Sequence, residues 1–210
     1  MRIFITRHGE SMTNIDADIT AKFPINVKNN VLTRQGVDQA VDYGLWLIEN
    51  KHDLHNIVCS PYARTKQTAF LIASTIQTLV PIHYDRTFRE IDWKINGRWH
   101  RDLDAQYPNL NVKTMPIDMK PVIDRKRKAH TLESPREVYD RVVPRFKRVV
   151  ELYRGAGDLL IVTHFFVVRA LQAYVEHGDP ERLLDYNPNN LARVVYDIDQ
   201  VADRFAQDDA

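Results

Sequence analysis

Short apolar segments that suit buried β-strands alternate with amphipathic helical segments along most of this 210-residue chain. The strongest strand candidate is 158–163, which contains the run Leu159-Leu160-Ile161-Val162, and another apolar run, Ile3-Phe4-Ile5, lies near the N-terminus. Strands that are linked by helices form a largely parallel sheet with helices on both faces. The pattern therefore predicts an α/β fold, a three-layer α/β/α sandwich with a mostly parallel central sheet.

Cap residues and apolar periodicity indicate where the helices begin. Thr33, Ser60 and Ser134 are expected to be N-caps, and the last two precede a proline at the first helical position. A further helix is expected over 165–177, and Pro144 predicts a kink or a restart in the helix after Ser134. The remaining strands are expected at 56–59, 81–84 and 192–198, the last of them at or near an edge of the sheet.

Two finer expectations concern the packing of one helix and the end of the chain. In the helix after Thr33, helical spacing puts a set of apolar or small residues on the face toward the core: Val37, Ala40, Val41, Gly44, Leu45 and Ile48. The acidic end of the chain, 207–210, is expected to be frayed.

The chain is expected to form a single domain over residues 1–210, because its length suits one hydrophobic core. Helical and strand periodicity is lost over 93–134, which contains several prolines, and we interpret this stretch as an inserted lid region. The basic run Arg125-Lys126-Arg127-Lys128 lies inside it. A solvated loop explains this run better than a site for an acidic or phosphorylated partner.

Composition excludes several classes of partner and points to a compartment. A net charge of +1 gives no argument for nucleic acid, and no apolar run approaches the roughly 20 residues that span a bilayer. The N-terminus lacks the pattern of a signal peptide. Cys59 is the only cysteine, so it has no internal disulfide partner, and we interpret it as a small buried residue. A cytoplasmic protein without a nucleic-acid or membrane partner is expected.

Charged or titratable side chains follow four of the expected strands. Arg7 and His8 follow the first, Arg64 the second, Glu90 the third and His164 the fourth. Ligands of open α/β sheets bind outside the carboxyl ends of the strands, so these side chains are expected to converge there. Coincidence explains any one of them, but less readily a set that supplies what a single reaction needs.

That reaction is the transfer of a phosphoryl group. Two guanidinium forks and two imidazoles can surround a phosphate. A neutral His8 can attack phosphorus to give a phosphohistidine, while Glu90 protonates the leaving oxygen and later deprotonates a water. With His8 neutral, Glu90 protonated and His164 cationic, the rate is expected to fall on both sides of a pH optimum.

No metal or other cofactor is required by this scheme, because the arginines supply the positive charge. A metal alternative would use His52, Asp53 and His55, which are close in sequence. They lie at the end of an expected helix without a further ligand nearby, so a solvated helix end is the favoured interpretation.

Five motifs occur along the chain in the following order: Arg7-His8-Gly9-Glu10-Ser11 with Asn14, Leu32-Thr33-Arg34-Gln35-Gly36 with Gln39-Ala40, Cys59-Ser60-Pro61-Tyr62-Ala63-Arg64-Thr65 with Thr68-Ala69, Arg89-Glu90-Ile91-Asp92-Trp93, and Val162-Thr163-His164. In sequence and in order they resemble the motifs of the histidine phosphatase superfamily, which includes cofactor-dependent phosphoglycerate mutases and many phosphomonoesterases. Glu133-Ser134 and Arg141-Val142 also resemble a segment of that family.

The resemblance implies a role for each matching residue and favours the phosphatase branch. His8 is implied to be the phosphorylated nucleophile and Glu90 the proton donor. The phosphate is implied to be held by Arg7, Asn14, Arg64 and His164. Phe165-Phe166 departs from the family, which commonly has glycines there, and so does Trp93-Lys94-Ile95-Asn96-Gly97, where the phosphatase pattern has glycine sooner.

Three functions stay open, with a metal-independent phosphomonoesterase acting on a small phosphorylated substrate favoured. The second is a cofactor-dependent phosphoglycerate mutase. The third is a catalytically idle phospholigand-binding or protein-interaction module in which Phe165-Phe166 blocks turnover. The loop 16–30 and the lid at 93–134 are expected to select the substrate, and neither their sequences nor any other feature of the chain names that substrate or an oligomeric state.

Overall fold

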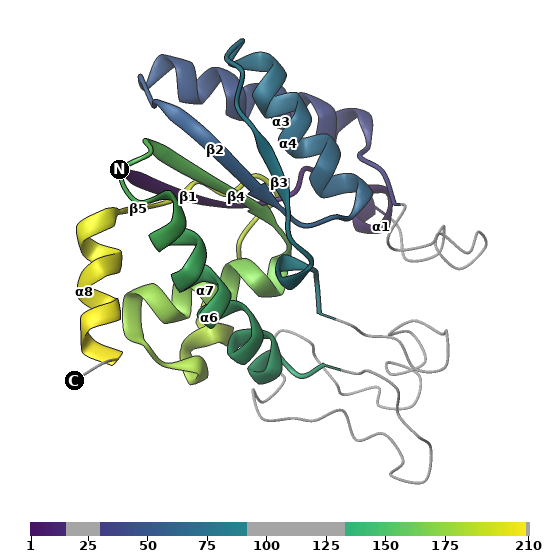
Figure 1. Cartoon of the computed structure of the whole chain (residues 1–210). Coiled ribbons are helices and arrows are strands. Elements are labelled where there is room, and N and C mark those ends of the chain that lie inside the picture. Colours follow the sequence, from purple (N-terminus) through teal and green to yellow (C-terminus); the bar gives the residue numbers. More distant parts are fainter. Residues whose placement is uncertain (16–29, 92–132, 209–210) are drawn as a thin grey trace, which may run out of the picture.

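The computed structural model describes residues 1–15, 30–91 and 133–208. At its centre is a five-stranded sheet in the order β3-β2-β4-β1-β5 (Figure 1). The first four strands are parallel, and β5 runs antiparallel to β1 at the edge of the sheet. The strands are β1 (Arg2–Arg7), β2 (Leu54–Cys59), β3 (Ile82–Tyr84), β4 (Asp158–Thr163) and β5 (Val194–Asp197).

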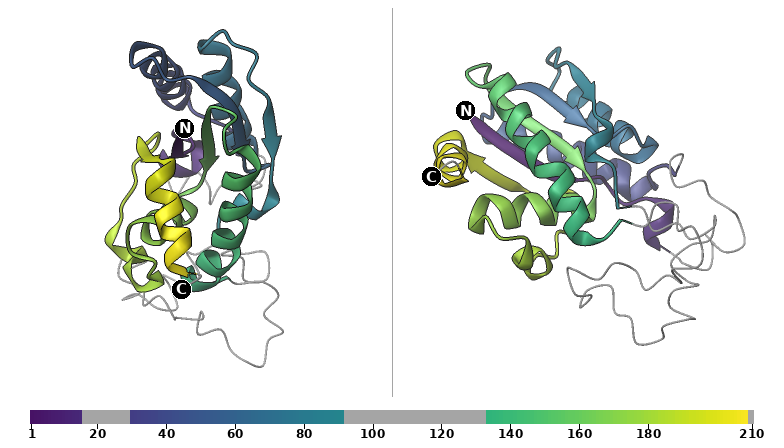
Figure 2. Two further views of the ribbon diagram at one scale, coloured as in Figure 1. Left: turned by 60° about the vertical axis from the view of Figure 1, so that its left-hand side comes forward. Right: turned by 60° about the horizontal axis from the view of Figure 1, so that its bottom comes forward.

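Helices cover both faces of this sheet, which confirms the predicted α/β architecture (Figure 2). On one face α3 and α4 pack against Phe4 and Leu160, and on the other α6 and α7 pack against Ile3 and Ile161. The helices are α1 (Met12–Ile15), α3 (Arg34–Glu49), α4 (Ala63–Thr75), α6 (Pro135–Tyr153), α7 (Phe165–His177) and α8 (Ile198–Asp208), with the 3-10 helices η2 (Arg86–Phe88) and η3 (Pro180–Asp185).

Strand β4 occupies the middle of the sheet, and all of its residues are buried. Ile161 lies opposite Ile5 of β1 on one side and Val58 of β2 on the other. A strand that is covered on both faces needs a continuous apolar run, because neither set of alternating side chains reaches water. This requirement explains why the sequence identified β4 so clearly, and it fixes the strand ends on which the candidate site is built.

Two of the three expected N-caps are confirmed, and the third is wrong. Thr33 accepts a hydrogen bond from the Gly36 amide, and Ser134 forms a reciprocal capping box with Glu137. Helix α4 begins only at Ala63 and has no side-chain cap. The reason lies in Ser60, whose amide donates to the carbonyl of Val162 and so extends the pairing with β4 beyond the end of β2.

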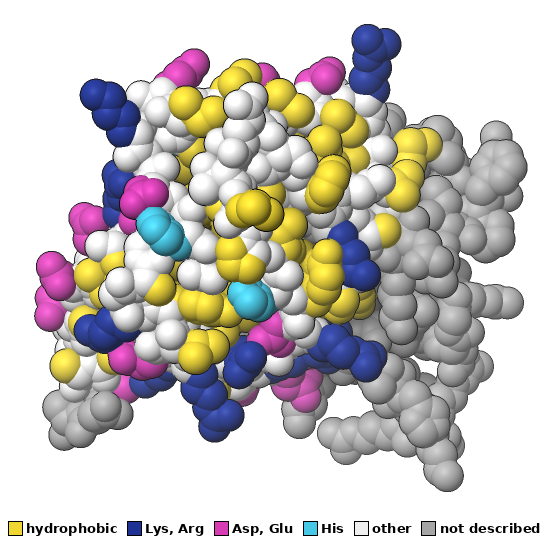
Figure 3. All heavy atoms as spheres, turned by 45° about the horizontal axis from the view of Figure 1, so that its top comes forward, with side chains coloured by type: hydrophobic (Ala, Val, Ile, Leu, Met, Phe, Trp, Pro, Cys, Tyr) yellow, Lys and Arg dark blue, Asp and Glu magenta, His cyan; other side chains and the backbone are white. Residues whose placement is uncertain are grey.

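The expected inward face of α3 is partly wrong. Ala40 and Gly44 are buried as expected, but Leu45 and Ile48 are exposed, by 45% and 49%. Figure 3 shows hydrophobic side chains at the surface on the side of the molecule where α3 and α4 lie. The helix buries a face rotated by about one residue, formed by Gly36, Ala40, Tyr43, Gly44 and Leu47. On this face Gly36 packs closely against the Glu10 backbone and Gly44 against Thr75 of α4.

The C-terminal helix α8 was missed by the sequence analysis, which expected a frayed end over 207–210. Asp208 is held by the Lys147 ammonium at 2.6 Å and by the Tyr174 hydroxyl at 2.8 Å. These two partners belong to α6 and α7, which are distant in sequence. Ile198, Val201 and Phe205 do have helical spacing, a pattern that the sequence analysis did not use. Residues 209–210 lie outside the described part of the chain.

The insertion expected over 93–134 lies outside the described residues except for Glu133 and Ser134. Pro144 does not divide α6, which runs as one helix from Pro135 to Tyr153. Among the helices of residues 1–15, 30–91 and 133–208, none combines the length and the apolar character that crossing a bilayer requires.

Candidate active site

The parallel strands deliver the expected side chains to one edge of the sheet. His8 follows β1 directly and His164 follows β4, and their rings lie 5.3 Å apart between centroids. Arg64 belongs to the first turn of α4, after β2, and contacts both imidazoles. Glu90 follows η2, after β3, and its carboxyl group binds the start of α7. The expected convergence of the four strand ends is thus present.

Arg64 bridges the two histidines and determines which ring nitrogens carry hydrogen. Its Nε donates to His8 Nε2 at 2.9 Å, and its Nη2 lies 3.1 Å from His164 Nδ1. Because a guanidinium can only donate, both of these ring nitrogens are acceptors. The other nitrogens then donate, His8 Nδ1 to the Gly9 carbonyl at 2.7 Å and His164 Nε2 to the Ser60 hydroxyl at 2.8 Å. Both rings are therefore neutral, and the lone pair of His8 Nε2 is the nucleophilic one.

Burial lowers the pKa of both histidines well below the usual 6.5, and the charge of Arg64 lowers each of them further. The side chains of His8 and His164 are 3% and 0% exposed. A charged imidazole at either position would lose its hydration and would lie beside the positively charged guanidinium of Arg64. The expectation of a cationic His164 is therefore wrong for the unliganded protein.

Gly9 lets the loop after β1 approach α3 closely. A Cβ at this position would lie 2.4 Å from the Gly36 carbonyl oxygen, a distance that no side chain can occupy. The Gly9 amide donates to the Thr68 hydroxyl at 3.1 Å, and this hydroxyl donates to the Arg64 carbonyl at 2.8 Å. The loop that carries His8 and the helix that carries Arg64 are thus fixed to each other.

The Glu90 carboxylate receives three backbone hydrogen bonds, from Ile91 at 3.0 Å, Phe165 at 3.1 Å and Phe166 at 3.3 Å. The last two donors are the first amides of α7, whose helix dipole also favours an anion. Burial nevertheless raises the pKa of Glu90, against the Ile91 hydrogen bond and the charges of Arg64 and Arg7, which lower it. A carboxyl group with a raised pKa can hold a proton closer to neutral pH.

Phe165 and Phe166 have different positions, so they do not act as one apolar plug. Phe166 belongs to the core and is 3% exposed. Phe165 is half-buried, and its ring lies 5.2 Å from the guanidinium carbon of Arg7. Arg7 also donates from Nη1 to the Pro188 carbonyl at 3.5 Å, and its buried Nε has no hydrogen-bond partner among the described residues. The pair therefore supports Glu90 through its amides and Arg7 through one ring.

Asn14 is not brought into contact with the two histidines in the described part of the chain. It is exposed on α1, and its Oδ1 accepts hydrogen bonds from the amide and the hydroxyl of Ser11, at 2.9 Å and 2.8 Å. Only its amide hydrogens remain for a phosphate, so its binding role stays a prediction. Glu10 accepts from the Thr33 hydroxyl at 2.8 Å, a contact that ties the loop to the start of α3.

Three residues of the site were not identified as such from the sequence. Ser60 was expected to cap a helix, yet its hydroxyl binds His164. Thr68 joins Gly9 to Arg64, and Asn190 donates to the His8 carbonyl at 2.7 Å. Ser60 and Thr68 belong to the segment around Arg64 that resembles the family, and this is the signal that could have drawn attention to them. Asn190 has no such signal.

The metal alternative and the lone cysteine also have defined positions. The His52 ring packs against Phe4 and Trp46, at 4.8 Å and 4.9 Å between centroids, while His55 Nδ1 lies 2.8 Å from the Asp53 carbonyl oxygen. Within residues 1–15, 30–91 and 133–208, no group of three or more His, Cys, Asp or Glu could hold a metal ion. Cys59 is buried, and burial raises its pKa to about 12, so its thiol is inert near neutral pH.

The chain belongs to the histidine phosphatase superfamily, since the family model of its branch 1 matches residues 3–206. A protein of Escherichia coli (strain K12), adenosylcobalamin/alpha-ribazole phosphatase, is 33% identical, with 95% of this chain and 91% of that protein covered. A 2,3-bisphosphoglycerate-dependent phosphoglycerate mutase of Staphylococcus haemolyticus (strain JCSC1435) is 23% identical, with 94% of both chains covered.

Solved structures share the fold. YhfR of Bacillus stearothermophilus superposes with a TM-score of 0.71 at 22% identity, covering 94% of this chain and 91% of its own. The alpha-ribazole phosphatase from Shigella flexneri gives a TM-score of 0.66 at 27% identity, covering 90% of this chain and 87% of its own. The family thus contains both phosphatases and mutases that resemble this chain.

Proposed function

We propose that this protein is a metal-independent phosphomonoesterase that works through a phosphohistidine on His8. One observation carries the proposal. The His8 ring is buried and neutral, its Nδ1 hydrogen is anchored on the Gly9 carbonyl, and its Nε2 lone pair faces the guanidinium of Arg64. A nucleophile for phosphorus needs a neutral, oriented lone pair beside positive charge, and this geometry supplies all three.

In the proposed first step, the phosphate of the substrate takes over the donors of Arg64, which frees the lone pairs of His8 Nε2 and His164 Nδ1. Arg7 and Arg64 hold the phosphate, with Asn14 as a further donor, and His164 joins them once its Nδ1 has taken up a proton, which the bound anion favours. His8 Nε2 forms a bond to phosphorus, and the bond from phosphorus to the ester oxygen breaks. Glu90 gives its proton to that leaving oxygen, so an alcohol departs. The Gly9 carbonyl stabilises the positive charge that develops on the ring, because it accepts from Nδ1.

In the second step a water attacks the phosphohistidine, and Glu90 takes the proton of that water. The bond between phosphorus and Nε2 breaks, inorganic phosphate leaves, and His8 is neutral again. The same carboxyl group thus acts once as acid and once as base. Its raised pKa supports the acid role, since the carboxyl group keeps its proton to a higher pH than an exposed glutamate does.

We rank a phosphatase above a mutase for this chain, and the higher identity of one relative supports this order. The relative at 33% identity is described as a phosphatase, whereas the mutase from Staphylococcus haemolyticus is 23% identical. We extend the proposal to a small phosphorylated substrate and to one catalytic domain that covers residues 1–210, with the insertion at 93–134 as part of it. The natural substrate is left open.

Turnover of 4-nitrophenyl phosphate in the presence of a chelator tests the proposal. Wild-type protein should hydrolyse it and should yield an acid-labile phosphoenzyme on rapid quenching, and His8→Ala should do neither. Equal rates in the two proteins would exclude His8 as the nucleophile. Interconversion of the two phosphoglycerates faster than phosphate release would assign a mutase instead. Binding of phosphate esters without any trapped phosphoenzyme would favour a catalytically idle module.

A further inference from the structure

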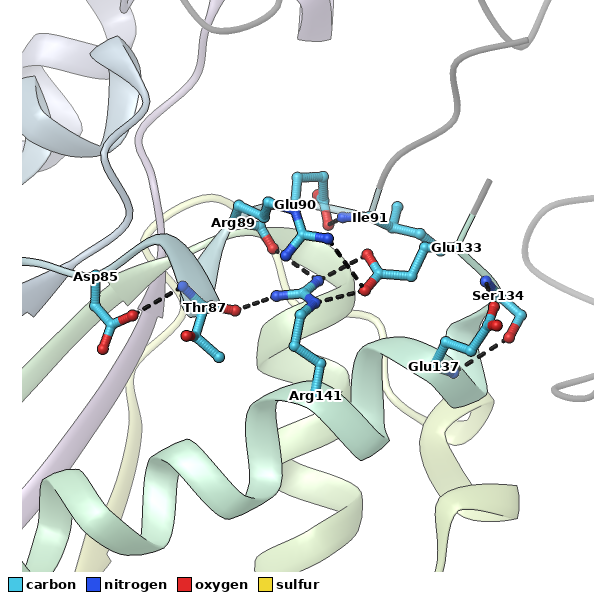
Figure 4. Close-up of polar contacts among 9 residues, drawn as sticks. All are labelled: Asp85, Thr87, Arg89, Glu90, Ile91, Glu133, Ser134, Glu137 and Arg141. Atoms are coloured by element: carbon cyan, nitrogen blue, oxygen red, sulfur yellow. Dashed lines mark hydrogen bonds and ion pairs between the residues drawn. The ribbon is translucent and has the colours of Figure 1, made fainter. Parts of the chain in front are cut away.

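The backbone that leads to Glu90 is held by side chains of two other elements, of which Figure 4 shows Arg141 of α6. Arg141 of α6 donates to the Thr87 carbonyl and to the Arg89 carbonyl, the latter at 3.2 Å. Between these two, the Phe88 carbonyl accepts from the Thr163 hydroxyl at 2.7 Å. Three consecutive carbonyls before Glu90 are thus bound by side chains, so little freedom remains for the position of its Cα.

The guanidinium of Arg141 is oriented by Glu133. Arg141 Nε and Nη2 bind the two oxygens of this carboxylate, at 2.5 Å and 2.8 Å, while the third nitrogen, Nη1, points to Thr87 (Figure 4). The side chains of Arg141 and Glu133 are only 16% and 11% exposed. A planar fork that binds a carboxylate with two nitrogens has a defined direction, which a flexible ammonium lacks.

Glu133 also lies 3.5 Å from the Arg89 guanidinium. Arg89, the residue before Glu90, is therefore held twice: its side chain faces Glu133, and its carbonyl accepts from Arg141. The carboxyl group of Glu90 itself points away from Arg141, toward the amides of Ile91 and of the start of α7. Arg141 therefore acts on the backbone that carries Glu90 and does not pair with its charge.

We propose that Arg141, oriented by Glu133, is a positioning residue that aligns Glu90 for proton transfer. The inference rests on the proposed function for its catalytic consequence, because the proton that Glu90 transfers belongs to that reaction. It accounts for Glu133-Ser134 and Arg141-Val142, which the sequence analysis connected with the family but not with any step of the chemistry.

A leaving-group series measures the alignment of Glu90. Phenyl phosphate has a basic leaving group that needs a proton, whereas 4-nitrophenyl phosphate loses a stable anion and needs it far less. Arg141→Lys keeps the charge and loses the fork. We expect it to lower kcat/KM for phenyl phosphate about tenfold, and for 4-nitrophenyl phosphate by less than about twofold. Glu133→Gln should act in the same direction, and Glu90→Gln defines the complete loss of the donor.

Arg136→Lys is the matched control, since Arg136 lies on the same helix in an exposed ion pair with Asp140. It should leave both rates unchanged. A fall by the same factor on both substrates in Arg141→Lys, or no fall at all, would overturn the positioning role. The first result indicates a general structural effect, and the second shows that Glu90 keeps its alignment without the fork.

A measurement without turnover separates this inference from the proposed function. In NMR spectra of the folded protein, the amide resonances of Ile91, Phe165 and Phe166 report the hydrogen bonds to Glu90. Arg141→Lys should shift them, and Arg136→Lys should not. Unchanged resonances would contradict the inference even if no phosphatase activity were found. Shifted resonances in a protein that forms no phosphoenzyme would keep the positioning of Glu90 and reject the reaction.

Discussion

At the scale of single residues, His8 and Glu90 share a water-poor site, yet the same burial moves their pKa values in opposite directions. Burial disfavours the charged form of each group, so it lowers the pKa of the imidazole and raises that of the carboxyl group. The neutral forms are those that the proposed first step uses, an unprotonated nucleophile and a protonated acid. The burial of the site therefore prepares both groups at once.

The pH dependence of kcat/KM follows from these directions. The acid limb should lie below pH 6.5, because His8 becomes protonated only at its lowered pKa. The alkaline limb should lie above pH 4.5, where Glu90 loses its proton at its raised pKa. A bell-shaped profile for phenyl phosphate is expected, and Glu90→Gln should remove the alkaline limb. An identical alkaline limb in Glu90→Gln would assign that limb to another group.

Ser60 offers a second test at this scale, because its hydroxyl is the acceptor for His164 Nε2. Ser60→Ala leaves a buried N–H without this partner, at a cost of about 1–3 kcal/mol in unfolding free energy. We expect kcat/KM to fall by about tenfold, a change equal to roughly 1.4 kcal/mol. Imidazole nitrogen shifts in NMR spectra should show a loss of the single tautomer of His164. A retained tautomer together with full activity would exclude this role for Ser60.

The residues of the site differ in how far sequence could identify them. Arg7, His8, Glu90 and His164 follow strands directly or closely, and parallel strands bring such positions to one edge. The bond between Ser60 and His164 joins residues 104 positions apart, and the orientation of a hydroxyl is decided by tertiary packing alone. Which atoms meet at the strand ends could therefore not be predicted, although which segments meet could.

At the scale of elements, the contrast between β4 and α8 shows what patterning can reveal. Strand β4 is buried on both faces, so its four central residues, 159–162, are all apolar and its bounds could be predicted. Helix α8 buries Val201 fully and packs Ile198 and Phe205 against the same core, while Lys147 and Tyr174 hold Asp208. Its few apolar residues do have helical spacing, but they follow directly on β5, so this short pattern was not recognised as a separate helix.

Helix α6 gives a prediction about stability at this scale. Its capping box satisfies two amides, since Ser134 accepts from Glu137 and the Glu137 carboxylate accepts from Ser134. Ser134→Ala should reduce the unfolding free energy by about 1 kcal/mol, measured by urea denaturation. Ser134→Thr keeps the hydroxyl and should lose much less. An equal loss in both variants would contradict capping as the source, because threonine keeps the hydroxyl.

At the scale of the whole molecule, the lowered pKa values of His8 and His164 connect stability with pH. The unfolded chain protonates these groups near pH 6.5, whereas the folded chain does so only at lower pH. Their contribution to stability is therefore complete above pH 6.5 and is lost as the pH falls toward the lowered values. Glu90 acts in the opposite sense, because its raised pKa makes the folded state lose stability as the pH rises above 4.5.

On acidification below pH 6.5, two histidines reduce the unfolding free energy and only Glu90 increases it. We therefore predict a net loss of stability. Urea denaturation at a series of pH values should show a falling unfolding free energy, and His164→Asn should make the decline less steep. Asp85 and Asp208, whose pKa values are lowered by Arg145 and Lys147 against their burial, add a further loss near and below pH 3.8. A stability that is constant between pH 6.5 and 4.5 would contradict the neutral state of the two rings.

The place of β1 in the sheet has a consequence for how the protein is made. Arg2 on β1 pairs with Asp158 on β4, 156 residues later, and β5, the other neighbour of β1, is later still. At synthesis rates of about 5–20 residues per second, β1 has no pairing partner on either edge for roughly 10 to 30 s. During that time its apolar residues need protection from aggregation. A nascent chain that stops before β4 carries the candidate nucleophile but lacks His164 and the strand that pairs with β1, so premature termination leaves the candidate site incomplete.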